Sequence, residues 1–216
     1  MNFNGLHLTI SKQELAQLPC VHYQDGATVI DTACKVDEAV EHLRSHGIVG
    51  FDTETRPTFR KGQSHKVSLL QLASRERCYL FRLNMIGMPA SLLALLEDPE
   101  VKKVGLSLRD DFHSLDKICD IEPDGFIDLQ NYVKAFHIAD NSLSRIYAIL
   151  FGERISKGQR LTNWEADRLT PAQVGYAAFD AVACIRIYDY LRSGSFRPED
   201  SKYLRPIEEP EMHKAI

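Results

Sequence analysis

The segment GIVGFDTET, residues 47–55, places two carboxylates one residue apart after an apolar run. Because side chains alternate between the two faces of a strand, Asp52 and Glu54 would point to the same face. Two negative charges at that separation repel each other, and burial raises the cost of keeping both ionised. We therefore expect a positively charged group between them.

Acidic side chains also follow two other predicted elements. Asp110 and Asp111 come after the apolar run KKVGLSL, and Tyr176 and Asp180 are four residues apart in YAAFD, which places them on one helix face. Each pair alone has an ordinary explanation, as a turn, a helix cap or a packing pair. Together they indicate a site, because parallel strands present their carboxyl ends to a common crevice where open α/β sheets bind ligands.

Four carboxylates around one cavity cannot all stay ionised without cations. Mg²⁺ and Mn²⁺ prefer oxygen ligands. Two such ions roughly 3.5–4 Å apart would hold the attacking and leaving oxygens of a phosphoryl displacement. A tyrosine hydroxyl beside them could orient or deprotonate a water molecule.

The elements that must position these residues alternate between helices and strands. Apolar spacing predicts strands over residues 47–52, 66–74, 77–83, 102–108 and 125–129, the second and third forming a hairpin. It predicts helices over residues 36–46, 89–98, 110–119, 130–138, 142–152 and from Thr170 or Pro171 to about 193. This order is typical of an α/β fold with a mixed sheet.

Length and composition fit a single globular domain with an added tail. The chain has 216 residues, of which 44% are apolar and 26% charged, and no apolar run could cross a membrane. The N-terminus lacks the features of a secretory signal, and the five scattered cysteines favour neither a disulfide framework nor a zinc knuckle, so we expect a cytoplasmic location. A net charge of −4 argues against gripping nucleic acid by bulk charge alone, yet it allows bound cations and a local basic patch.

The three motifs, in this order, resemble those of the 3′–5′ exonucleases of the ribonuclease D and Werner-syndrome type. These enzymes use four acidic residues and a tyrosine on a ribonuclease H-like fold. KVSLLQLAS, CYLF and the segment from residue 142 to 181 also match, so the resemblance covers about residues 36–192. It implies a mixed central β-sheet flanked by helices for this domain. Residues 1–35 would be an N-terminal extension packed on or preceding it, and residues 193–216 a C-terminal tail on the surface or partly disordered.

The resemblance also implies roles. Asp52 would bridge two divalent ions, Mg²⁺ or Mn²⁺, with Glu54 and Asp180 completing the site of the nucleophilic water. Counting from Gly105 favours Asp111 over Asp110 as the acid that supports the second ion. Tyr176 would position the water and accept its proton, and hydrolysis at the 3′ end of DNA or RNA would release nucleoside 5′-monophosphates. No organic cofactor and no membrane contact are expected.

Several residues are candidates for substrate contact. Arg56 belongs to a cationic loop, residues 55–66, that also carries Phe59 and could guide a backbone and stack a base, although it could equally be a solvated connection. Thr53 within the first motif, with Lys157 and Arg160 in the segment that matches the family, completes this set. Trp164 could be a base platform but more often such a residue packs in a core. His42 and His46 have the spacing of zinc ligands, but without a visible third ligand they are interpreted as surface residues.

Two alternative functions remain. A haloacid-dehalogenase-like phosphatase also begins with an apolar strand that ends in acids, but it does not need Tyr176 with Asp180. A nucleic-acid-binding module with an inactive site is the alternative from another class, and metal-dependent hydrolysis would separate it from an enzyme. The sequence shows no second RNA-binding domain and leaves open DNA against RNA, single-stranded against recessed ends, and the oligomeric state.

Overall fold

A six-stranded mixed sheet forms the centre of the protein. The computed structural model describes residues 5–23, 25–60, 62 and 64–207. The strand order is β3-β6-β5-β4-β7-β8, with β4 paired antiparallel to β5 and parallel to β7. The sheet strands are β3 (Thr28–Ile30), β4 (Ile48–Thr55), β5 (Val67–Ala73), β6 (Cys78–Phe81), β7 (Lys102–Gly105) and β8 (Phe126–Asp128). The predicted mixed α/β fold is confirmed, including the β5–β6 hairpin.

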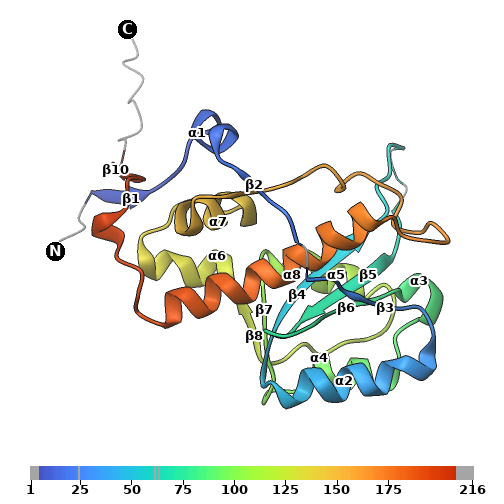
Figure 1. Ribbon diagram of the computed structural model, residues 1–216. Coiled ribbons are helices and arrows are strands. Elements are labelled where there is room, and N and C mark those ends of the chain that lie inside the picture. The colour runs from blue at the N-terminus through green and yellow to red at the C-terminus, as the bar shows by residue number, and fades with distance from the viewer. Residues whose placement is uncertain (1–4, 24, 61, 63, 208–216) are drawn as a thin grey trace, which may run out of the picture.

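Helices cover both faces of this sheet (Figure 1). One face packs against α6 (Leu129–Tyr132), α7 (Leu143–Phe151) and the long α8 (Pro171–Arg192). The other packs against α2 (Val36–Ser45), α4 (Ala90–Leu96) and α5 (Leu108–Leu115). Every residue of β5 is buried, with Leu69 in one core and Leu70 in the other. Burial on both faces explains why this strand has a near-continuous apolar sequence.

The remaining elements are short. They are β1 (Leu6–Leu8), α1 (Lys12–Gln17), β2 (Cys20–Val21), α3 (Leu83–Ile86), β9 (Arg154–Ile155) and β10 (Leu204–Pro206), with 3₁₀ turns at Ala33–Lys35, Val133–Phe136 and Pro198–Asp200. Within the described ranges, no helix combines the length and apolar character needed to cross a membrane.

Strand boundaries differ from the prediction at two places that matter for the acids. Strand β4 continues to Thr55, so Asp52 and Glu54 lie within it and not after it. The strand predicted over 102–108 ends at Gly105, and α5 begins at Leu108. Ser107, with φ 64° and ψ 38°, takes a left-handed conformation that ends the extended run. The acids therefore lie in the first turn of a helix.

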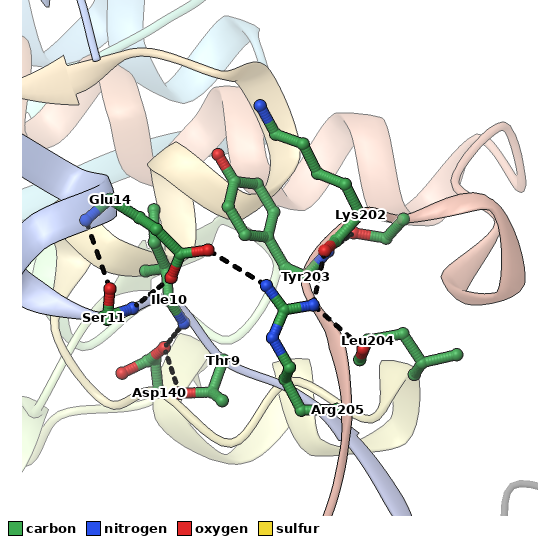
Figure 2. A network of polar contacts seen from close by, with 10 residues as sticks. Thr9, Ile10, Ser11, Glu14, Asp140, Lys202, Tyr203, Leu204 and Arg205 are labelled. Atoms are coloured by element: carbon green, nitrogen blue, oxygen red, sulfur yellow. Dashed lines mark hydrogen bonds and ion pairs between the residues drawn. The ribbon is translucent and has the colours of Figure 1, made fainter. Parts of the chain in front are cut away.

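The two ends of the described chain pair with each other, unlike the predicted loose tail. Strand β10 is antiparallel to β1, and Tyr203 is 4% exposed, because its ring supplies apolar area that the core can bury. Figure 2 shows the adjoining polar contacts: Asp140 accepts from Thr9 Oγ1 and the Ile10 backbone, while Arg205 binds Glu14 at 3.0 Å. Residues 208–216 of that tail lie outside the described residues.

The N-terminal segment contributes to the fold in two further places. Strand β3, which precedes residue 36, joins the central sheet beside β6. Strand β2 pairs in parallel with β9, so the segment also reaches the loop that precedes α8. The first 35 residues therefore border both the sheet and the connection that carries Lys157 and Arg160.

Helix α8 lies directly on β4 because Gly50 has no side chain. An added Cβ at Gly50 would lie 1.9 Å from the carbonyl oxygen of Ala181, a backbone atom that cannot rotate away. This close approach brings Asp180, the residue before Ala181, next to the carboxylates of β4.

We expect Gly50→Ala to destabilise the protein by at least about 1–3 kcal/mol, the range for overpacking a core. Thermal unfolding should show the loss. Gly175→Ala in the same helix is the matched control: its Cβ would meet only Tyr23 O at 3.8 Å, so the change should stabilise by about 0.5–1 kcal/mol. Equal unfolding midpoints for the Gly50 variant and the wild type would contradict the close packing.

Candidate active site

Three carboxylates converge between β4 and α8. Oxygen atoms of Asp52, Glu54 and Asp180 all lie within 4.8 Å of one another. Asp52 and Glu54 share one face of β4 by strand alternation. Glu54 and Asp180 are 8% and 7% exposed, and Asp52 is half-buried. Oxygen-only donors at this spacing are the ligands that hard divalent cations prefer.

Asp111 lies beside this group from the first turn of α5. Its carboxylate accepts a hydrogen bond from Thr53 Oγ1, so Thr53, a predicted substrate contact, here orients an acid. Asp111 lies outside the group of three, but its charge raises the pKa of both Asp52 and Glu54. Asp110 is exposed. The contact with Thr53 favours Asp111 as the member of the site.

Burial and mutual repulsion hold these acids partly protonated. Burial, then the charges of Asp180 and Asp111, raises the pKa of Asp52 well above its usual value. The same causes raise the pKa of Glu54 to about 9. Burial raises the pKa of Asp180 to about 7 and that of Asp111 to about 6. The site is therefore short of positive charge, and a divalent cation would let the carboxylates ionise together.

Tyr176 lies one helical turn before Asp180 and donates its hydroxyl hydrogen bond to that carboxylate. Burial, then the charges of Asp180 and Glu54, raises the pKa of Tyr176, so the phenol keeps its proton near neutral pH. Trp164 is fully buried, with its ring centroid 6.1 Å from that of Tyr176. The tryptophan thus supports the tyrosine ring, as expected for a packing residue.

Two of the predicted cationic contacts face the acids. Lys157 lowers the pKa of Asp180 and Arg160 lowers that of Glu54, and both side chains belong to exposed residues. Arg56 instead pairs with Glu165 at 3.0 Å, and His65 contacts the same carboxylate at 3.0 Å. In this loop Phe59 is 83% exposed, whereas Lys61 lies outside the described residues.

Sequence reasoning missed two residues that border the site. Gln71 is the cross-strand partner of Asp52 and is fully buried, and among the described residues neither of its amide atoms has a hydrogen-bond partner. A single amide within the apolar run VSLLQLA was its signal. Asp128 accepts from the backbone N–H groups of Ser107 and Leu108, both at 3.2 Å, and so fixes the start of the helix that carries Asp111.

Comparisons with known proteins agree with this geometry. Residues 27–194 match the family model described as 3′-5′ exonuclease. The mouse (Mus musculus) bifunctional 3′-5′ exonuclease/ATP-dependent helicase WRN is 32% identical over 155 residues, which are 69% of this chain and 11% of that protein.

Two solved structures share the fold. Escherichia coli RNase D, titled an exoribonuclease involved in structured RNA processing, superposes with a TM-score of 0.69 at 25% identity, over 77% of this chain and 44% of that chain. The Aedes aegypti Nibbler EXO domain gives a TM-score of 0.71 at 21% identity, over 83% and 97% of the two chains. The predicted ribonuclease H-like fold is thereby confirmed.

Proposed function

This chain belongs to the 3′–5′ exonuclease family, and we propose that it hydrolyses the last phosphodiester bond at the 3′ end of a nucleic acid and releases a nucleoside 5′-monophosphate. One observation supports this most: Asp52, Glu54 and Asp180 converge within 4.8 Å, next to Tyr176. The chain spans only 11% of the length of mouse WRN, so substrate and pathway are proposals for this chain alone.

The carboxylates would hold two divalent ions, Mg²⁺ or Mn²⁺. Asp52, Glu54 and Asp180 would bind one, and Asp52 with Asp111 would bind the other, directly or through water. Once bound, the ions would stabilise the charge that builds on the attacking water, the phosphate and the leaving 3′-oxygen. The donor set fits this chemistry because it consists of oxygens and its acids now carry raised pKa values.

The protein's own side chains would orient the reactants. Tyr176, held protonated and hydrogen-bonded to Asp180, is placed to position the attacking water, and passing the water's proton to it is the further step that the family resemblance implies. Lys157 and Arg160, whose charges act on the acids, would contact the phosphates on the 3′ side of the substrate.

A basic groove offers a path for the rest of the strand. Lys12 of α1, with Arg154 and Lys157 beyond α7, lines a cavity of about 510 Å³. Arg145 lines it too but is paired with Asp140 at 2.7 Å. Because Lys157 also acts on Asp180, the groove adjoins the acids, and we propose that phosphates upstream of the scissile bond lie along it.

The double variant Lys12→Gln/Arg154→Gln should raise KM about tenfold for a 20-nucleotide single strand and leave KM for a trinucleotide unchanged. The slope of log affinity against log salt should fall by about 0.7 for each lost phosphate contact. Lys117→Gln, an exposed lysine that does not line the groove, is the matched control. An equal change in KM for both substrate lengths would contradict this path.

The test of the proposed function is a cleavage assay on 3′- and 5′-labelled single-stranded DNA and RNA, with Mn²⁺ or with chelator. Stepwise shortening from the 3′ end that chelator abolishes would support the enzyme and identify the preferred sugar. Metal-dependent binding without cleavage of any substrate would instead support the inactive binding module. Release of phosphate from a monoester, without strand shortening, would favour the phosphatase.

A further inference from the structure

A second cluster of metal-binding side chains lies at the other face of the sheet. His42 and His46 of α2 and Glu76, in the turn between β5 and β6, each offer a ligand atom, and these atoms lie within 4.8 Å of one another. Helix α2 packs on the face opposite α8 (Figure 1), so this cluster is separate from Asp52, Glu54 and Asp180. The sequence showed the histidine pair, and the fold supplies the acid.

One ring nitrogen of His46 is free to bind a metal. Its Nδ1 lies 2.8 Å from the backbone carbonyl oxygen of His42, which can only accept, so Nδ1 carries the proton. Nε2 therefore keeps its lone pair and lies 3.6 Å from Glu76 Oε1. Metal-bound histidines usually donate their second ring N–H to such a carbonyl or carboxylate, which fixes the ring orientation.

The other two members are also suited to binding. Burial, with the charges of His46 and Arg77, lowers the pKa of His42, so its imidazole is neutral and available as a ligand. The hydroxyl of Ser74 accepts from the backbone N–H groups of Glu76 and Arg77 at 3.2 and 3.0 Å. This fixes the backbone of the turn, while the Glu76 side chain, 69% exposed, can rotate toward the histidines.

We propose that His42, His46 and Glu76 bind one zinc ion that links α2 to the β5–β6 turn. Zinc takes nitrogen and carboxylate oxygen ligands about 2.0–2.2 Å away, so tetrahedral ligand atoms lie about 3.4 Å apart. The 3.6 Å between His46 Nε2 and Glu76 Oε1 is already close to that spacing. Three protein ligands leave the fourth position for water. The proposal is independent of the proposed exonuclease activity.

Zinc titration by calorimetry would test this site in untagged protein. The background carries Asp52→Asn, Glu54→Gln and Asp180→Asn, so that the first carboxylate group cannot compete. We expect one Zn²⁺ per chain, binding at least about tenfold weaker in Glu76→Gln and abolished in His46→Ala. His113→Ala, which removes an exposed histidine outside the cluster, should bind as the background does.

A second measurement keeps the test independent of the background variant. In wild-type protein, ¹⁵N NMR of the imidazoles should show Zn²⁺ moving the Nε2 resonance of His46, with Nδ1 staying protonated. Absence of zinc binding by the background, or unchanged affinity in both Glu76→Gln and His46→Ala, would overturn the proposal. So would a wild-type spectrum in which the His46 resonances do not respond to the ion.

Discussion

Asp52→Asn should lower the 3′–5′ exonuclease kcat by at least about a thousandfold at saturating Mn²⁺. Asp52 is the carboxylate shared by both proposed ions, and it lies within 4.8 Å of Glu54 and Asp180. Metal ions at such sites contribute several kcal/mol of charge stabilisation in the transition state, and each 1.36 kcal/mol is a factor of ten in rate. Single-turnover cleavage of a 5′-labelled strand measures this loss directly.

The neighbouring acids of α5 provide a matched pair of controls. Asp111→Asn should also lower kcat by at least about tenfold, because its carboxylate is held at the site by Thr53. Asp110→Asn removes the same charge one residue away from an exposed position and should stay within about twofold of wild type. The reverse order of the two effects would assign the second ion to Asp110, and full activity of Asp52→Asn would refute the two-ion mechanism.

The metal-free protein should lose stability as the pH rises from about 5 to 9, and Mn²⁺ should restore it. Glu54, Asp180 and Asp111 have pKa values of about 9, 7 and 6 in the folded protein, all above their ordinary values. In this window the folded state binds more protons than the unfolded state, so the free energy of unfolding falls with rising pH. Glu54 alone corresponds to a loss on the order of several kcal/mol at the upper end.

Thermal unfolding at pH 5, 7 and 9, with chelator or with Mn²⁺, measures this effect. The midpoint should fall with pH in chelator, and the gain from Mn²⁺ should be largest at pH 9, where no protons must be displaced. Glu54→Gln is the matched variant, because it removes the group with the pKa of about 9 and should flatten the decline in chelator. A metal-free protein that is as stable at pH 9 as at pH 5 would contradict the raised pKa values.

Local sequence patterns were enough to predict the elements and the acids. Strand alternation placed Asp52 and Glu54 on one face, and the helical repeat placed Tyr176 on the face of Asp180. Both arrangements follow from neighbours along the chain, and the structure shows them. The fully buried strand β5 and its hairpin were also visible, because apolar runs report burial without needing to know the partner.

Residues far apart in the sequence meet only through the fold, and the sequence could not show these contacts. Gly50 lets α8 approach β4, and this decides that Asp180 meets the carboxylates of β4. Glu76 becomes a neighbour of His42 and His46 through the packing of α2 beside the β5–β6 turn.

The sequence by itself therefore determined the identity of the acids, the tyrosine and the elements that carry them. The tertiary structure decided which acids converge, that Thr53 holds Asp111, and that the chain's two ends pair as β1 and β10. The physical reason is range: alternation, helical spacing and apolar runs are properties of adjacent residues. Close approach, shared burial and the resulting pKa shifts depend on packing between segments more than a hundred residues apart, as between Asp52 and Asp180.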